Sequence, residues 1–253
     1  MPLAGPKKAL VLSAGGMFAA YQAGAWEVLS AHFSPDIVVG ASAGALNAWA
    51  VAGGARPSEL RELWLDPACA ELAVVRGLRP PWLGVFDPAP LDARIEALWR
   101  AYRPRVEIGI VAVELRSLRP RLFRNDEITW RHLAASCAVP LCYRPIRLGT
   151  GLYVDGGLLE ALPLWAAAEM GARGIVAIDV FDRAPASPLR GALVRAGRSL
   201  LPRPPRPPGD VKVHRIVPSE NLGSARKAVF WQPATVQRWI ALGREDAARA
   251  ASP

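Results

Sequence analysis

The sequence has few of the residues that hold metal ions or build disulfide frameworks. It contains three cysteines and three histidines in 253 residues, and none of them has the spacing of a zinc site. Cys69, Cys137 and Cys142 are too few and too irregularly placed for a disulfide framework. We therefore expect no metal, no cofactor and a reducing, cytoplasmic compartment.

The chain also lacks a long apolar segment, although 51% of its residues are hydrophobic. No apolar run approaches the ~20 residues that a membrane-spanning helix needs. Lys7 and Lys8 precede an apolar stretch that could pass for a signal peptide, but glycines interrupt that stretch and the same residues fit a catalytic loop better. At this length, residues 1–253 are expected to form a single domain without internal repeats.

Acidic residues are scarce relative to basic ones, and the net charge is +9. Such a charge favours an anionic partner, either nucleic acid or an acidic lipid surface. A general use of Arg throughout the chain explains it equally well, because the basic residues are scattered. No nucleic-acid-binding motif is present, so we expect no nucleic acid and leave peripheral contact with an anionic membrane open.

Short apolar strands alternate with helices along the chain. The pattern predicts strands over 9–12 and 37–40, each followed by a helix, over 18–31 and 44–52. The later elements are expected to be helices over 57–65, 91–102, 128–137, 162–170 and 233–250, strands over 108–113, 122–123, 174–180 and 211–217, and a hairpin over 146–154. The almost wholly apolar strand 174–180 is typical of a sheet covered on both faces. This is an α/β pattern with a parallel sheet.

Residues 183–210 break the alternation. Prolines and arginines fill 201–208 and predict a stiff, extended segment that cannot join a central sheet. Just before it, apolar residues at helical spacing lie opposite Arg190 and Arg198 and predict a short amphipathic helix. Such a helix fits an anionic membrane or a packed protein surface, and we favour the packed helix.

A serine stands between two glycines where the second strand turns into a helix. Gly40, Ser42 and Gly44 form a G-x-S-x-G motif, in which residues without a Cβ allow a sharp turn that exposes the serine hydroxyl. The following helix would direct its N-terminal N–H groups toward an oxyanion formed there. The motif therefore predicts a nucleophilic serine.

A glycine pair follows the first strand in the same way. Gly15 and Gly16 would let backbone N–H groups approach a ligand before the next helix begins. A tight structural turn or a dinucleotide-binding loop are the alternatives. A dinucleotide site requires G-x-G-x-x-G and an acidic residue at the end of the second strand, where this chain has Gly40.

The base that would activate Ser42 is harder to identify. The histidines, His32, His132 and His214, are each expected to be structural or exposed. His214 alone follows the serine and a plausible aspartate, as in α/β-hydrolases, but their nucleophile follows the fifth strand and only two strands precede Ser42. Asp155, which a strand delivers into a turn formed by Gly156 and Gly157, is the remaining candidate; Asp179 and Asp182 are weaker.

Asp155 is also a natural residue for an ordinary turn. An aspartate in water has a pKa near ~3.9 and is a poor base. The catalytic interpretation therefore requires a buried site beside Ser42 that raises the pKa of the carboxyl group.

These motifs together resemble the patatin-like phospholipase family. The resemblance rests on residues 12–24, 40–44, 135–140 and 155–157, continues through 162–164, and extends from about residue 9 to 180 in the family's order. It implies a three-layer α/β/α fold with a mostly parallel sheet. It also implies a Ser-Asp dyad that hydrolyses lipid acyl esters without histidine, with the glycine loop as the oxyanion hole.

Carried over to this chain, the resemblance makes Ser42 the nucleophile and Asp155 the base. Gly15, Gly16 and Met17 become the oxyanion hole, and Gly40, Gly44, Gly156 and Gly157 support the motifs. The expected function is hydrolysis of phospholipid or lysophospholipid esters through an acyl-serine intermediate.

The chain departs from the family's glycine loop at three positions. Ala14 replaces its first glycine, Phe18 its basic residue and Ala19 its last glycine. A Cβ would strain a loop that needs a positive φ, and Phe18 could instead line an acyl pocket. A lipid-binding member with impaired catalysis is therefore the alternative.

Overall fold

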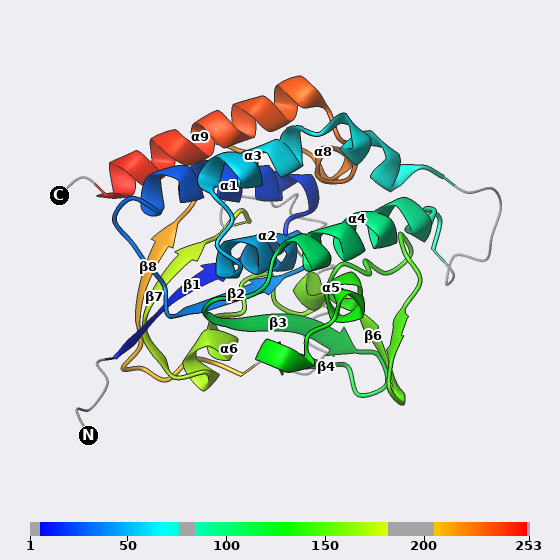
Figure 1. Cartoon of the computed structure of the whole chain (residues 1–253), viewed down its shortest axis with the longest axis horizontal. Helices are drawn as coiled ribbons and strands as arrows, with labels where there is room; N and C mark the ends of the chain where they lie inside the picture. Colours follow the sequence, from blue (N-terminus) through cyan, green and yellow to red (C-terminus); the bar gives the residue numbers. More distant parts are fainter. Residues whose placement is uncertain (1–5, 76–83, 182–204, 252–253) are drawn as a thin grey trace, which may run out of the picture.

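A mostly parallel sheet forms the centre of the part of the chain that the computed structural model describes, which is residues 6–75, 84–181 and 205–251 (Figure 1). The strand order is β5-β6-β3-β2-β1-β7-β8, with β4 paired to β3. Strands β1, β2, β3, β7 and β8 are parallel to one another, whereas β4, β5 and β6 join by antiparallel pairing. The strands are β1 (Lys7–Leu12), β2 (Ile37–Ala41), β3 (Glu107–Glu114), β4 (Arg119–Arg124), β5 (Ile146–Leu148), β6 (Gly151–Val154), β7 (Ala172–Ile178) and β8 (Lys212–Ile216).

Helices lie on both sides of this sheet, as Figure 1 shows. One side carries α1 (Ala19–Leu29), α2 (Ala43–Ala52), α3 (Pro57–Leu65), α4 (Pro88–Ala101), α5 (Trp130–Ser136) and α9 (Pro233–Ala251). The other side carries α6 (Leu164–Glu169). Short helical segments are η1 (Gly16–Phe18), η2 (Pro67–Ala73), η4 (Asn125–Glu127), η5 (Gly156–Leu158) and α8 (Ala225–Val229). The predicted α/β/α fold is confirmed.

Successive side chains of a strand point to opposite faces of the sheet, so one short strand contributes to the core on both sides. In β1, Leu10 and Leu12 point into the core beneath α1 and α2, whereas Ala9 and Val11 pack toward α6. All four side chains are at most 1% exposed. A strand buried on both faces must be apolar throughout, as this one is.

Most predicted elements are present, with shifted ends. The helix expected over 91–102 begins three residues earlier, at Pro88, because Asp87 caps it: its Oδ1 accepts a hydrogen bond of 3.1 Å from the N–H of Ala89. The strand expected at 122–123 is the longer β4, and α8 and η2 were not predicted. The amphipathic helix and most of 183–210 lie outside the described residues. Within the described residues, no helix has the length and apolar character to cross a membrane.

Candidate active site

Ser42 occupies a strained turn between β2 and α2. Its φ of 54° and ψ of −133° lie in a region that residues with a side chain rarely adopt. The flanking glycines make this turn possible: a Cβ on Gly40 would lie 2.3 Å from the carbonyl oxygen of Gly44, and one on Gly44 would lie 2.3 Å from that of Ser13. Strain of this kind is maintained by the surrounding contacts and is typical of functional sites.

Ser136, at the end of α5, holds this turn in place. Its Oγ accepts a hydrogen bond of 2.8 Å from the backbone N–H of Ser42 and donates one of 2.7 Å to the carbonyl of Val111. The side chain is completely buried. One hydroxyl therefore ties the turn after β2 to the neighbouring strand β3. Its role was not predicted from the sequence, although a polar side chain directly after the apolar residues 133–135 was a usable signal.

Replacing Ser136 with alanine is expected to lower the free energy of unfolding by about 1–3 kcal/mol, because the buried N–H of Ser42 and the carbonyl of Val111 both lose a partner. Urea denaturation measures this change. Ser117→Ala, at an exposed turn, is the matched control and should change stability by less than about 0.5 kcal/mol. Equal stabilities for the two variants would contradict the positioning role.

Asp155 follows β6 and also lies beside the turn that carries Ser42, because β6 and β2 both pair with β3. Ala41 pairs with Val111 and Val154 pairs with Val113, so the residue after β6 lies beside the turn that carries Ser42. The residue as a whole is 6% exposed. Its Oδ1 accepts a hydrogen bond of 2.8 Å from the N–H of Gly157.

Burial raises the pKa of Asp155 from its ordinary 3.8 to about 6, while the Ser42 hydroxyl and the Gly157 N–H act in the opposite direction. Among the described residues, Oδ2 has no hydrogen-bond partner of regular geometry. The two side chains therefore adjoin each other without a well-formed hydrogen bond. Contacts of this kind often tighten only when substrate binds. A carboxyl group with this pKa is a usable base near neutral pH.

The glycine loop after β1 completes the cluster. Gly16 has a φ of +54°, and a Cβ on it would lie 2.3 Å from the carbonyl oxygen of Ala228 in α8. Within the described part of the chain, the N–H groups of Gly15 and Gly16 make no hydrogen bond, whereas the N–H groups of Ser13 and Ala14 are paired with the carbonyls of Ile178 and Ala161. The loop therefore presents unpaired donors.

The three departures from the family's loop are accommodated. Ala14 does not have a positive φ, and its Cβ occupies the space left by Gly157, where an added Cβ would lie 2.4 Å away. Ala19 is helical, with a φ of −64°. Phe18 does not line the cavity of the described residues; its ring packs edge-on against Trp239, with ring centroids 5.0 Å apart. The acyl-pocket interpretation of Phe18 is not supported, since the ring joins the core beneath α9.

A chain of buried hydrogen bonds supports the loop from behind. Asn47 donates to the side chain of Gln22 (2.9 Å), and Gln22 donates to the carbonyl of Ser13 (2.7 Å). The Ser13 hydroxyl accepts from the N–H of Val180 (3.0 Å), and Trp64 donates to Asn47 (2.8 Å). A fully paired polar network of this kind fixes the backbone around it.

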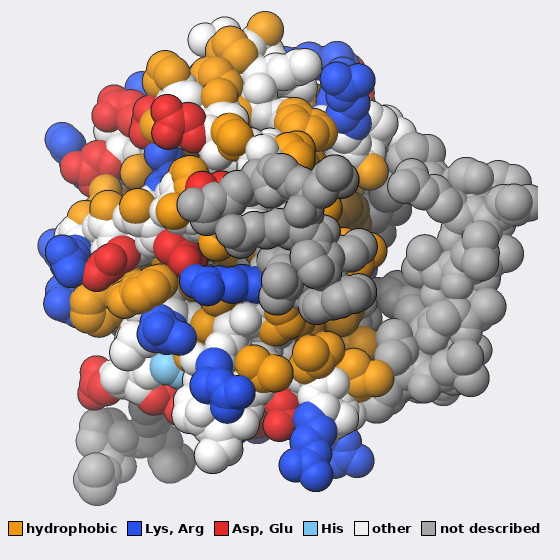
Figure 2. All heavy atoms as spheres, turned by 90° about the vertical axis from the view of Figure 1, so that its right-hand side faces the viewer, with side chains coloured by type: hydrophobic (Ala, Val, Ile, Leu, Met, Phe, Trp, Pro, Cys, Tyr) orange, Lys and Arg blue, Asp and Glu red, His pale blue; other side chains and the backbone are white. Residues whose placement is uncertain are grey.

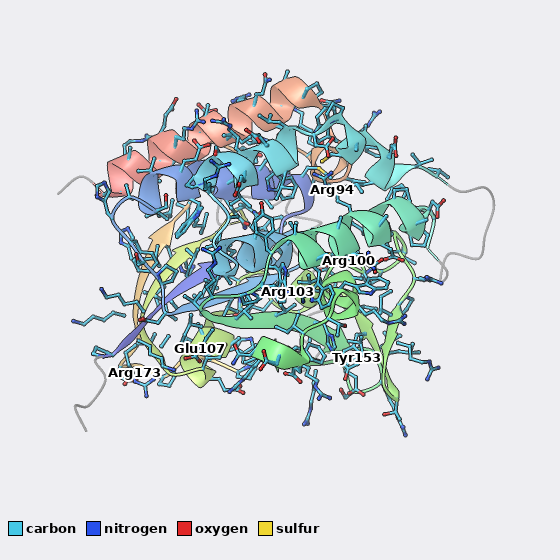
Figure 3. All side chains as sticks on the ribbon, in the orientation of Figure 1. Arg94, Arg100, Arg103, Glu107, Tyr153 and Arg173 are labelled. Atoms are coloured by element: carbon cyan, nitrogen blue, oxygen red, sulfur yellow. The ribbon has the colours of Figure 1, made fainter. Side chains whose placement is uncertain are left out.

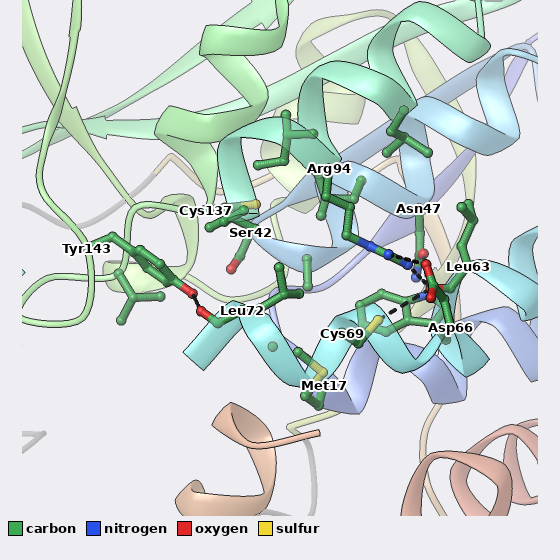
Figure 4. Close-up of a pocket in the computed structure, with 18 of the residues that line it drawn as sticks. Met17, Ser42, Asn47, Leu63, Asp66, Cys69, Leu72, Arg94, Cys137 and Tyr143 are labelled. Atoms are coloured by element: carbon green, nitrogen blue, oxygen red, sulfur yellow. Dashed lines mark hydrogen bonds and ion pairs between the residues drawn. The ribbon is translucent and has the colours of Figure 1, made fainter. Parts of the chain in front are cut away.

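A cavity of about 410 Å³ opens beside Ser42 (Figure 4). Its walls are largely apolar and come from η1, α2, α3, η2, α4, α8 and the segment after α5. Met17, Leu46, Leu72, Leu91, Ile95, Leu98, Val139 and Val229 are among the lining residues. Its size and apolar walls suit an alkyl chain.

The polar groups that border this cavity are engaged with one another. Arg94 extends from α4 toward the end of α3 (Figure 3), where it donates a hydrogen bond of 2.7 Å to Asp66 and another to the carbonyl of Leu63. Tyr143 donates to the carbonyl of Leu72. Figure 4 places these pairs at opposite ends of the cavity, with Ser42 and Cys137 between them. Arg94, Asp66 and Tyr143 therefore have partners among the described residues, and the carboxyl group beside Ser42 is that of Asp155.

His214 and Asp179 belong to β8 and to the end of β7, neither of which is adjacent to β2 in the sheet. His214 is exposed on β8, which lies three strands from β2 in the sheet. Asp179 accepts from the N–H of Phe181 and lies 3.9 Å from Arg215, and Asp182 is outside the described residues. Among the described residues, no group of His, Cys, Asp and Glu side chains could hold a metal ion.

Residues 10–168 match the family model described as patatin-like phospholipase. Patatin-like phospholipase domain-containing protein 7 of Rattus norvegicus is 29% identical over 199 residues, covering 72% of this chain and 14% of the rat protein. Uncharacterized protein YqhO of Bacillus subtilis is 27% identical over 206 residues, covering 68% of this chain and 71% of YqhO. The structure of VipD from Legionella pneumophila superimposes with a TM-score of 0.55 at 13% identity, over 97% of this chain and 66% of that chain.

Proposed function

Because the chain belongs to the patatin-like phospholipase family, we propose that it is a lipid acyl hydrolase that cleaves carboxylic esters of the phospholipid or lysophospholipid type. One observation carries the proposal. Ser42 on a strained turn adjoins the buried Asp155, whose pKa is raised to about 6, at the wall of an apolar cavity. A structural turn needs neither the strain nor the burial of a carboxyl group.

In the proposed reaction, Asp155 takes the proton of the Ser42 hydroxyl as its oxygen attacks the ester carbonyl carbon. The N–H groups of Gly15, Gly16 and Met17 hold the negative charge that develops on the carbonyl oxygen. The C–O bond to the alcohol breaks, and the alcohol leaves with the proton from Asp155. Water then loses a proton to Asp155, attacks the acyl-Ser42 ester and releases a fatty acid, and the proton returns to Ser42.

The geometry of the glycine loop favours hydrolysis over lipid binding without turnover. Ala14 and Ala19 occupy backbone conformations that tolerate a Cβ, and Phe18 packs into the core rather than distorting the loop. The N–H groups of Gly15 and Gly16 have no hydrogen-bond partner within residues 6–75, 84–181 and 205–251. We also place the protein in the cytoplasm, because Cys69, Cys137 and Cys142 are all free.

Activity is expected to depend on acyl-chain length. Each methylene placed in the cavity contributes about 0.8 kcal/mol, so kcat/KM should rise by up to roughly fourfold per methylene until the cavity is filled. Leu46→Trp, on the cavity wall, should move the optimum to shorter chains, and Leu46→Ala should move it to longer ones. A series of p-nitrophenyl esters measures this. Equal rates for short and long chains in all three proteins would contradict the acyl-binding role of the cavity.

A further inference from the structure

Six exposed apolar side chains border the solvent side of the cavity. We call them the apolar rim; they are Val74, Val75, Val85, Val139, Leu141 and Phe230, between 38% and 65% exposed. Chain neighbours of three rim residues line the cavity itself: Phe86 follows Val85, Cys142 follows Leu141, and Val229 precedes Phe230. The rim therefore adjoins the mouth of the cavity; Val139 also lines the cavity, whereas Val75 and Leu141 lie outside its lining.

The rim residues come from separate segments but form one surface. The N–H of Val85 donates a hydrogen bond of 3.0 Å to the carbonyl of Leu141, and Val75 forms an antiparallel bridge with Phe86. The rings of Phe86 and Phe230 meet edge-on, with centroids 6.2 Å apart. Figure 2 shows this end of the molecule, where hydrophobic side chains lie beside Lys and Arg. Contiguous exposed apolar surface of this kind marks an interaction site.

The backbone conformation of Leu141 indicates that the exposure of the apolar rim is functional. Its φ is 68°, a conformation that disfavours a branched side chain, and its side chain is 65% exposed. Glycine or asparagine would fit both the backbone and the solvent better. The turn therefore exposes a leucine where glycine or asparagine would be favoured. Observed strain of this kind indicates a functional position.

The charges beside the rim are mainly positive. Arg226 and Lys227 are exposed on α8, and the guanidinium of Arg226 lies 5.9 Å from the ring centroid of Phe230. Ala228 and Val229 of this helix line the cavity. The apolar side of α8 therefore faces the site, and its basic side faces solvent. Glu71 is the exposed acidic residue nearest in sequence to Val74, and Arg144 pairs with Asp92.

We propose that the apolar rim docks on an anionic lipid bilayer, with Arg226 and Lys227 at the headgroup level and the cavity mouth facing the acyl chains. Exposed apolar side chains next to basic ones complement a surface of that composition. A bilayer also supplies acyl esters directly to the cavity. This inference rests on the proposed function, because docking would bring acyl esters to the cavity. Vesicle binding is nevertheless measured independently of hydrolysis.

Sedimentation of the full chain with phosphatidylcholine vesicles, with and without phosphatidylglycerol, tests the proposal. The wild type should bind the anionic vesicles more tightly, and added salt should weaken that preference. Val75→Asn/Leu141→Asn should lower the partition coefficient roughly tenfold on both vesicles. Asparagine tolerates the backbone of Leu141, so this variant is expected to fold. Arg226→Gln/Lys227→Gln should lower binding roughly tenfold or more on anionic vesicles alone.

Matched controls lie at the opposite end of the sheet, where the parallel strands begin. Val213→Asn and Lys8→Gln/Lys212→Gln alter exposed residues of β8 and β1 and should leave vesicle binding unchanged. Hydrolysis of a soluble short-chain ester should be unaltered in all these variants. Rim variants that bind vesicles like the wild type would overturn the proposal. So would a dimer, seen by light scattering, that depends on the rim while no protein binds vesicles. Vesicle binding without any esterase activity would refute only the proposed function.

Discussion

Ser42→Ala is expected to reduce kcat for ester hydrolysis by roughly ten-thousandfold or more, as loss of a catalytic nucleophile does elsewhere. Without the hydroxyl, no acyl intermediate forms, and Asp155 has no proton to accept from the enzyme. The KM for a soluble ester should change little, since the apolar cavity is intact. Steady-state hydrolysis of a p-nitrophenyl ester measures both constants.

Two companion variants separate chemistry from folding. Ser42→Gly should be equally inactive but more stable by about 1 kcal/mol, because glycine adopts the observed φ of 54° without strain. Ser117→Ala, in the turn after β3, should keep full activity. A Ser42→Ala protein that is folded and retains hydrolysis would refute the assignment of the nucleophile.

Asp155→Asn is expected to lower kcat by roughly a hundredfold to ten-thousandfold, the usual range for loss of a general base. In the wild type, the base must be deprotonated. Since the pKa of Asp155 is raised to about 6, kcat/KM should rise with pH and level off above that value. A pH–rate profile of a neutral ester measures this. A profile that is flat between pH 4 and 8 would contradict the role of Asp155.

Deprotonation of Asp155 raises activity but is expected to lower the stability of the fold. Because its folded pKa lies above its unfolded pKa, the native state binds the proton more tightly. The contribution of Asp155 to stability is therefore fully present below about pH 3.8 and is lost as pH rises through about 6. At neutral pH, Asp155→Asn should raise the free energy of unfolding by about 2–3 kcal/mol. Urea denaturation at pH 4 and 7 should show that difference only at the higher pH.

Local features of the sequence were sufficient to predict the turns that carry the candidate site. The apolar run of β2 and the spacing of Gly40 and Gly44 predicted a strand, a sharp turn and a helix, because each of these depends on residues close in sequence. The strand expected over 174–180 is present for the same reason, as β7 (Ala172–Ile178), which begins and ends two residues earlier.

Contacts between distant segments could not be predicted in this way. The proximity of Asp155 to Ser42 depends on two strand registers around β3, and only the family resemblance indicated it. The role of Ser136 depends on α5 ending beneath the turn of Ser42. Phe18 packs on Trp239, a residue of the last helix, so its position depends on how α9 covers α1. The cavity wall from α8 likewise had no local signal.

The most direct test of the account is to locate the covalent adduct left by a fluorophosphonate, which reacts with activated serines. Intact-protein mass followed by peptide mapping should find a single adduct on Ser42. Labelling should be much slower in Asp155→Asn and absent in Ser42→Ala. An adduct on another residue, or hydrolysis that persists while Ser42 stays unlabelled, would contradict the proposal that Ser42 and Asp155 form the catalytic pair.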